Sequence, residues 1–308
     1  MTNPAPGSIL VYDRAAASRR TTCLLMAGFV LILGGLVAGF TYALALPVSI
    51  MGVVGIVIIG YAVFSYYLST SVVLSISGAH EVTKEEEWEF VRRVENLCIG
   101  AGLPMPRVWV LEDSAPNAFA TGRDPEHSHV VVTRGLLDKL EPIELEGVLA
   151  HELSHIGNYD IRVMTVATVL VGIIALVSDV LMRFTIYGSG RRGGNRGKGN
   201  GSVMILIIVV SILAAILAPI IAQVLRMAVS RQREYLADAS GALLCRNPEA
   251  LASALEKIAG DHEPLEAANK ATAHLYIENP LKEHKSFLNN AFSTHPPVEE
   301  RIRILRSM

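Results

Sequence analysis

The stretch His151-Glu152-Leu153-Ser154-His155 decides the local fold and the expected chemistry of this chain. It continues the amphipathic run 145–150, and Pro142 stands near the first turn, a pattern that predicts a helix. Two histidines four residues apart project from one helix face, so both imidazoles can reach a single zinc ion. Glu152 is placed to take a proton from the water that attacks a substrate. We therefore expect peptide-bond hydrolysis at or near a membrane, and the amphipathic flanks disfavour the alternative of a solvated helix face with two unrelated histidines.

The composition points to membrane segments. The chain is 51% hydrophobic and only 18% charged, with a mean hydropathy of +0.40, whereas soluble proteins usually carry about a quarter charged residues. A net charge of −2 gives no argument for a nucleic-acid partner. Cys23, Cys98 and Cys245 are odd in number and far apart, which predicts reduced thiols instead of a disulfide framework.

Four apolar stretches approach the roughly 20 residues that cross a bilayer as a helix: 23–45, 48–68, 163–182 and 203–224. A cleaved signal peptide is the rival interpretation of the first, because Ala43-Leu44-Ala45 resembles a cleavage site. That stretch is longer than a signal core and another apolar stretch follows at once, so we expect an uncleaved helical hairpin over 21–68.

Basic residues near the spans predict the orientation in the bilayer. Arg14, Arg19 and Arg20 favour a cytoplasmic segment 1–20. The hairpin then returns the chain to the cytoplasm, so the two parts of the soluble domain, 69–160 and 229–308, would be cytoplasmic. The Gly/Arg-rich connector 187–201 is basic and predicted to be flexible, yet four full crossings would place it outside. Either charges elsewhere dominate, or the hydrophobic pair within 161–228 does not fully cross.

The part between the two hydrophobic pairs predicts a mixed domain. Thr83-x-x-Glu86 is a candidate capping box for a helix that runs through about Cys98. Residues 107–111 and 129–133 have the composition of short strands. The expected fold class is mainly α with a small β-sheet (α+β).

The extended stretch Asn117-Ala118-Phe119-Ala120, followed by Thr121-Gly122, precedes the metal helix. A strand here could line the cleft and pair with an extended substrate backbone. An ordinary core or edge strand is an equally open interpretation. His127 and His129 could chelate a metal, but they lie in a charged loop and we expect them to be solvated.

A catalytic zinc site needs a third protein ligand. Glu234, after the fourth apolar stretch, would bring a carboxylate from a second helix. Asp238, one turn later on the same face, could hydrogen-bond a ligand imidazole and fix its tautomer, and Asp160 is a further candidate for such support. Surface ion pairing with Arg231 is the alternative for Glu234 and Asp238.

Near the C-terminus, Ser293-Thr294-His295-Pro296 is followed by Arg301. His295 could donate a hydrogen bond to a developing oxyanion, and Arg301 could orient a neighbour or the substrate. A capped helix start at Thr294 and Pro296 is equally open.

Together these residues resemble the HtpX-type integral-membrane zinc metallopeptidases, the family that includes the CAAX prenyl proteases. The resemblance covers most of the chain and depends on the order of its parts: the hairpin, Asn117-Ala118-Phe119-Ala120, His151-Glu152-x-x-His155, the second hydrophobic pair, Glu234-x-x-x-Asp238 and Ser293-Thr294-His295-Pro296. The chain departs from the family pattern at Ser154, where many relatives carry glycine, and in the connector 187–201.

The resemblance implies a gluzincin-like site in which His151, His155 and Glu234 hold one Zn²⁺, with Glu152 as general base and acid. It implies that 117–120, with Arg301, bind the substrate and that His295 is an active-site residue. The implied fold is a zincin domain joined to membrane helices. The implied setting is quality control and stress response at a bacterial inner membrane, with polypeptide substrates and the active site facing the cytoplasm.

The sequence is also compatible with two other functions. One is a CAAX-type protease for lipidated C-termini, which four apolar stretches disfavour because that branch has a larger membrane chamber. The other is a membrane scaffold with structural zinc, which the presence of Glu152 disfavours because such a protein would not need this carboxylate.

Overall fold

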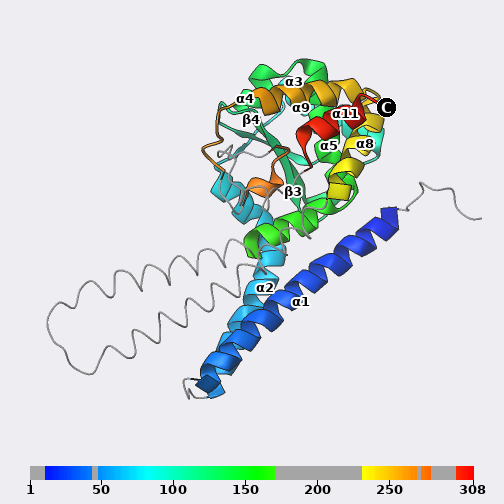
Figure 1. The fold of residues 1–308 in the computed structure, drawn as a ribbon. Helices are drawn as coiled ribbons and strands as arrows, with labels where there is room; N and C mark the ends of the chain where they lie inside the picture. The colour runs from blue at the N-terminus through cyan, green and yellow to red at the C-terminus, as the bar shows by residue number, and fades with distance from the viewer. Residues whose placement is uncertain (1–10, 44–47, 171–230, 269–271, 279–295) are drawn as a thin grey trace, which may run out of the picture.

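The computed structural model of this protein describes residues 11–43, 48–170, 231–268, 272–278 and 296–308 (Figure 1). A rounded domain contains the sheet and most of the short helices, and two long helices, α1 (Val11–Ala43) and α2 (Val48–Ser77), extend from it. The connector 187–201, His295 and most of the third and fourth apolar stretches lie outside the described residues.

The first two apolar stretches are helical, as predicted. The rings of Phe29 in α1 and Tyr61 in α2 are 6.0 Å apart, and the two helices expose a series of large apolar side chains: Leu24, Leu31, Val53, Ile56, Val57 and Ile59. Among the described residues, Gly55–Ser77 in α2 is long and apolar enough to cross a membrane. The four-span arrangement stays a prediction.

Helices α1 and α2 form hydrogen bonds with the chain that follows the helix of His151 and His155. The Ser18 hydroxyl donates a hydrogen bond to the backbone oxygen of Tyr159 at 2.8 Å, and the Tyr61 hydroxyl donates one to that of Val169 at 3.2 Å. Val73 and Leu74, near the end of α2, are buried in the same cluster as Phe119. One face of the sheet therefore packs directly on the end of a candidate membrane helix.

The sheet has four strands in the order β1-β2-β4-β3. Their bounds are His80–Glu81 for β1, Arg107–Leu111 for β2, Ala118–Gly122 for β3 and Ser128–Thr133 for β4. β2 and β4 are parallel, whereas β1 and β3 run antiparallel to their neighbours. Both predicted strands are confirmed, and β3 is an edge strand.

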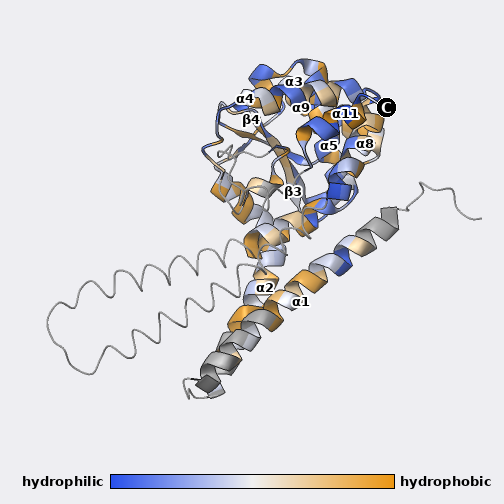
Figure 2. Ribbon diagram, viewed as in Figure 1, coloured by the Kyte–Doolittle hydropathy of each residue, from blue (hydrophilic) through white to orange (hydrophobic). Residues whose placement is uncertain are grey.

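The helices cover the other face of the sheet, as Figure 1 shows. They are α3 (Trp88–Ala101), α4 (Arg134–Lys139), α5 (Pro142–Gly157), α8 (Arg231–Cys245), α9 (Pro248–Gly260) and α11 (Val298–Leu305). The 3₁₀ turn η1 (Pro125–His127) lies between β3 and β4. The turn η2 (Ala273–Leu275) packs on the α2 side, because Leu275 belongs to the same cluster as Phe119 and the end of α2. α5 is central, and its Val148, Leu149 and Leu153 are fully buried in the main core. Hydrophilic residues gather on the outer helices (Figure 2). The α+β fold class is confirmed.

The predicted start of the helix at Thr83 is wrong. The Glu86 carboxylate accepts hydrogen bonds from the backbone N–H and hydroxyl of Thr83, at 2.8 and 3.0 Å. The backbone N–H groups of Glu86 and Glu87 bond back to the Thr83 carbonyl. These contacts close a separate turn, and α3 begins only at Trp88.

Candidate metal centre

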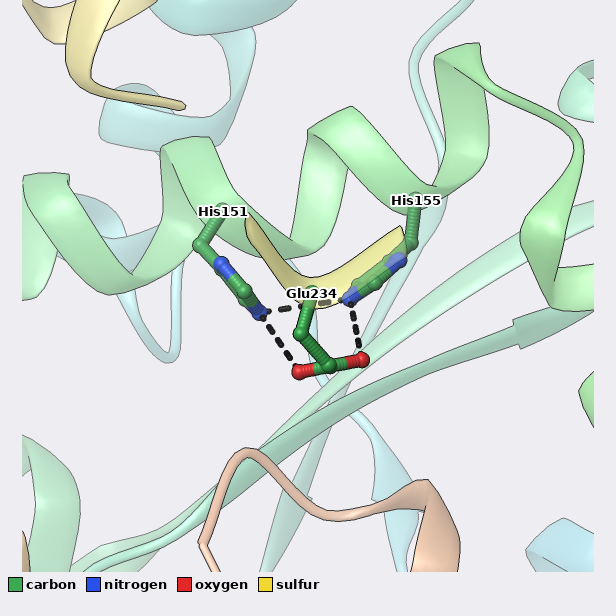
Figure 3. Close-up of side chains that lie close together, drawn as sticks. All are labelled: His151, His155 and Glu234. Atoms are coloured by element: carbon green, nitrogen blue, oxygen red, sulfur yellow. Dashed lines mark hydrogen bonds and ion pairs between the residues drawn. The ribbon is translucent and has the colours of Figure 1, made fainter. Parts of the chain in front are cut away.

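Helix α5, which carries His151 and His155, begins where the sequence predicts. At the start of α5, Pro142 occupies the first turn, and Glu141 and Glu144 form a capping box. His151 and His155 are only 1% and 5% exposed. Their Nε2 atoms point to the same space, 3.2 Å apart (Figure 3), because residues i and i+4 lie on one helix face.

Helix α8 brings a third donor to the same point. The Glu234 carboxylate lies 3.9 Å from Nε2 of His151 and 3.6 Å from Nε2 of His155 (Figure 3). Ligands about 2.0–2.1 Å from a tetrahedral zinc ion stand roughly 3.3 Å from one another. The three side chains are buried and their ligand atoms all lie within 4.8 Å of each other. This donor set fits zinc, and it is the only such group among the described residues.

A glycine lets the two ligand-bearing helices approach. A Cβ atom on Gly241 would lie 2.9 Å from the backbone nitrogen of His151 and 3.0 Å from its Cα. Since Cβ atoms essentially never come within 3.0 Å of another heavy atom, α8 can pack against α5 at this level only without a side chain. Sequence reasoning missed Gly241, although it follows Glu234 by seven residues and therefore lies on the same helix face.

A buried ion pair supports His151. The Asp238 carboxylate lies 2.9 Å from Nδ1 of His151 and accepts two hydrogen bonds from the Arg301 guanidinium, at 2.7 and 2.9 Å. Burial alone would raise the pKa of Asp238, but Arg301 and His151 outweigh it and hold the pKa at about 2. Asp238 is therefore an anion next to Nδ1 of His151, and Nε2 is left for a metal.

A second carboxylate supports His155. The Asp160 carboxylate lies 3.3 Å from Nδ1 of His155 and 3.7 Å from the guanidinium of Arg233. Tyr159, with a φ of 61°, turns the chain after α5 so that Asp160 faces back to the helix. Burial lowers the pKa of His155, but Asp160 and Glu234 outweigh it and raise the pKa to about 9.

Glu152 lies beside the three donors but is not one of them. Its carboxylate is 2% exposed and accepts a hydrogen bond from the backbone N–H of Ala120 in β3. Burial, with a contribution from Glu234, raises the pKa of Glu152 to about 7. A carboxylate with such a pKa can both take and return a proton near neutral pH.

The edge strand β3 passes this carboxylate. Ala118 and Ala120 face the main core with α5, and Phe119 faces the cluster beneath the sheet. The Asn117 side chain donates a hydrogen bond to the backbone oxygen of Glu278 at 3.1 Å. The Thr165 hydroxyl, which sequence reasoning missed, accepts a hydrogen bond from the N–H of Gly122 at 3.2 Å.

The remaining predicted residues have different outcomes. Arg301, expected to orient a neighbour or the substrate, is 1% exposed and donates hydrogen bonds to the neighbour Asp238, while its Nη1 also donates to the backbone oxygen of Ile277. The predicted solvation is wrong for His129, because the Trp109 indole packs on it and donates a hydrogen bond to its Nδ1. His127 is exposed and contacts Asp124. The predicted strand 129–133 is the sequence signal that separates them, because it includes His129 and excludes His127.

The chain is similar to known peptidases. Residues 84–308 match Peptidase family M48. Proteins named "Protease HtpX homolog" match nearly the whole chain: that of Tropheryma whipplei (strain Twist) is 44% identical over 299 residues, 97% of this chain and 99% of the relative. That of Lactobacillus acidophilus is 42% identical over 303 residues, 97% of this chain and 100% of the relative.

Among solved structures, S. mikatae Ste24p is 17% identical with a TM-score of 0.46, over 96% of this chain and 66% of that one. The match over residues 84–308 and the identity to the HtpX homologues show that the chain belongs to peptidase family M48, as an HtpX-type member.

Proposed function

We propose that this protein is a membrane-bound zinc endopeptidase. The observation that carries the proposal is Glu152, a buried carboxylate beside His151, His155 and Glu234 that the metal does not need as a ligand. A structural zinc site gains nothing from such a group, whereas hydrolysis needs a base. Membership of a peptidase family supports the same conclusion.

The side chains would divide the work as follows. When bound, a zinc ion would polarise the scissile carbonyl and make a nearby water more acidic. Glu152 accepts the proton of the attacking water and returns it to the leaving amine. The Ala120 N–H holds the Glu152 carboxylate in place, and Asp238 and Asp160 hold the two imidazoles.

We further propose that the substrates are misfolded or damaged membrane proteins. Two features support this. The end of α2 packs under Phe119 of the edge strand, so an extended segment that reaches β3 would lie close to the bilayer. Backbone pairing with an edge strand selects unfolded chains more than a side-chain sequence.

Hydrolysis of casein by the purified full-length protein in detergent tests the proposal. The wild type should cleave casein and lose this activity to a chelator. Glu152→Gln should lose about 10²–10⁴-fold in rate, while the matched Glu146→Gln, one turn and a half earlier in α5, should keep it. An active Glu152→Gln protein contradicts the assignment, and a zinc-loaded wild type without turnover favours a scaffold.

We propose that the active site faces the cytoplasm in a bacterial plasma membrane. The arginines before α1 support this orientation. With the three native cysteines replaced, a cysteine at the exposed position Asp138 should react with an impermeant thiol reagent only after the cells are opened. A cysteine within 188–199 should react from the outside if both hydrophobic pairs cross fully.

A further inference from the structure

The outer side of the edge strand β3 offers a defined set of backbone groups. The backbone N–H of Thr133 in β4 bonds to the carbonyl of Asn117, and the antiparallel register pairs Ala118 with Val132 and Ala120 with Val130. In such a ladder alternate residues bond to the partner strand and the others face away from it. Ala118, Ala120 and Gly122 therefore direct their N–H and C=O groups to the open edge, where a substrate backbone would pair.

Residues 276–278 of the same chain occupy part of this edge. The N–H of Ile277 donates a hydrogen bond to the carbonyl of Ala118 at 3.0 Å. The side chain of Asn117 donates one to the carbonyl of Glu278 at 3.1 Å, and Arg301 donates one to the carbonyl of Ile277 at 3.1 Å. All three bonds involve the main chain of 276–278, so any extended peptide could make the same ones.

The side chains of this segment also alternate as in a strand. Tyr276 has an extended backbone, with φ −74° and ψ 147°, and its ring packs edge-on against Phe119 at 4.9 Å in the cluster beneath the sheet. Ile277 is buried on the other side, in the main core. The segment is thus a short internal addition to the free edge of β3.

The rest of the outer edge is engaged as well. The N–H of Ala120 bonds to Glu152, and that of Gly122 bonds to Thr165. His151, Glu152 and Glu234 are at most 2% exposed. In this arrangement a substrate strand can pair with β3 only after some of the groups bonded to the outer edge of β3 have left it.

One feature makes 276–278 suited to release. The hydroxyl of Tyr276 is buried and has no hydrogen-bond partner among the described residues. A buried hydroxyl without a partner costs free energy that contact with water would restore. The buried position of Tyr276 therefore costs free energy, and release of residues 276–278 from the edge of β3 would remove that cost.

We propose that residues 276–278 hold the site in a closed state by occupying the substrate-binding edge, and that an extended substrate segment displaces them. This inference depends on the proposed peptidase function. It assigns to Asn117, Ala118 and Arg301 the main-chain contacts that a substrate takes over, and it explains why Arg301 contacts both Asp238 and a neighbouring backbone.

Two neighbouring substitutions should act in opposite directions. Ile277→Pro removes the N–H that bonds to Ala118, and the extended backbone of Tyr276 already suits a following proline. It should raise kcat/KM for casein by at least about three- to tenfold, the equivalent of the lost hydrogen bond, because the variant also loses the buried side chain of Ile277. Tyr276→Phe removes the unpartnered hydroxyl and should lower kcat/KM by a similar factor. If both variants have a lower kcat/KM than the wild type, the substitutions act through a general loss of stability and the proposal is overturned.

Hydrogen–deuterium exchange gives a readout that does not depend on turnover or on the proline variant folding. In full-length Glu152→Gln, excess casein should make the backbone of 276–278 exchange faster, on the order of tenfold, while β3 stays protected. Unchanged protection of 276–278 with casein bound would identify the segment as a permanent part of the core and overturn the proposal. A wild type without casein hydrolysis would instead overturn the proposed function, and the exchange result would still be readable.

Discussion

The carboxylate of Asp238 lies 2.9 Å from Nδ1 of His151 and accepts two hydrogen bonds from the guanidinium of Arg301. The three side chains come from α8, α5 and α11, which are far apart in the sequence. All are at most 1% exposed. The orientation of one candidate metal ligand therefore depends on a contact among three helices.

Asp238→Asn should weaken zinc binding without removing a ligand. The amide cannot fix the His151 ring as an anion does, and loss of such support typically costs about 10–100-fold in metal affinity. Competition with a chromophoric chelator measures the change. Asp138→Asn, the same substitution at an exposed position of α4, is the control. Equal affinities for the two variants would show that Asp238 does not position the ligand.

Arg301→Met should destabilise the domain. It leaves the Asp238 anion buried without its partner, which typically costs about 3–5 kcal/mol of the free energy of unfolding. Arg306→Met breaks exposed ion pairs with Glu249 and Glu256 and should cost less than about 1 kcal/mol. Denaturant unfolding in detergent, followed by tryptophan fluorescence, compares the two. A similar small loss in both variants would argue against a stabilising contact between Arg301 and Asp238.

Gly241→Ala should affect stability and the metal site together. The added methyl group meets the backbone of His151, and such overpacking typically costs about 1–3 kcal/mol. The resulting shift of α8 should also lower zinc affinity. Gly260→Ala places a methyl group in open space at the end of α9, so its unfolding and its zinc binding should match the wild type. Wild-type behaviour of Gly241→Ala would disprove the close helix contact.

Zinc binding should release a proton at pH 8. Without a metal ion, the pKa of His155 is raised to about 9, because Asp160 and Glu234 outweigh its burial. Only a neutral imidazole binds zinc, so the proton held below pH 9 must leave, and affinity should rise with pH up to about that value. Calorimetry at pH 8 in buffers of different ionisation enthalpy should give about one proton per zinc. Asp160→Asn should release less, and no release from the wild type would contradict the assignment.

Local patterns of the sequence predicted the three side chains, His151, His155 and Glu234, that the fold brings together. Helical periodicity alone predicts that His151 and His155 share a helix face, and that Glu234 and Asp238 do. Runs of β-branched residues predict the strands at 107–111 and 129–133. These features depend on neighbours within a few residues. The need for a third ligand suggested the pairing of Glu234 with the two histidines, and the family resemblance supported it.

Contacts between distant segments could not be predicted in this way. Nothing in Ile277 or Thr165 indicates that each bonds to β3, and the ion pair with Asp238 depends on where α11 ends up in the fold. Thr83 and Glu86 do form the expected contact, but it closes a turn instead of starting a helix. His129 was misjudged because Trp109 covers it from a parallel strand.

The zinc content of two glutamate variants tests the central claim most directly. Glu234 is assigned as a ligand and Glu152 as the base, although both are buried at the same site. Elemental analysis of the purified full-length protein should find about one zinc per chain in the wild type and in Glu152→Gln, and little in Glu234→Ala, with casein hydrolysis in the wild type alone. Three results would contradict this division of roles. They are full zinc content in Glu234→Ala, loss of zinc from Glu152→Gln, and casein hydrolysis by either variant.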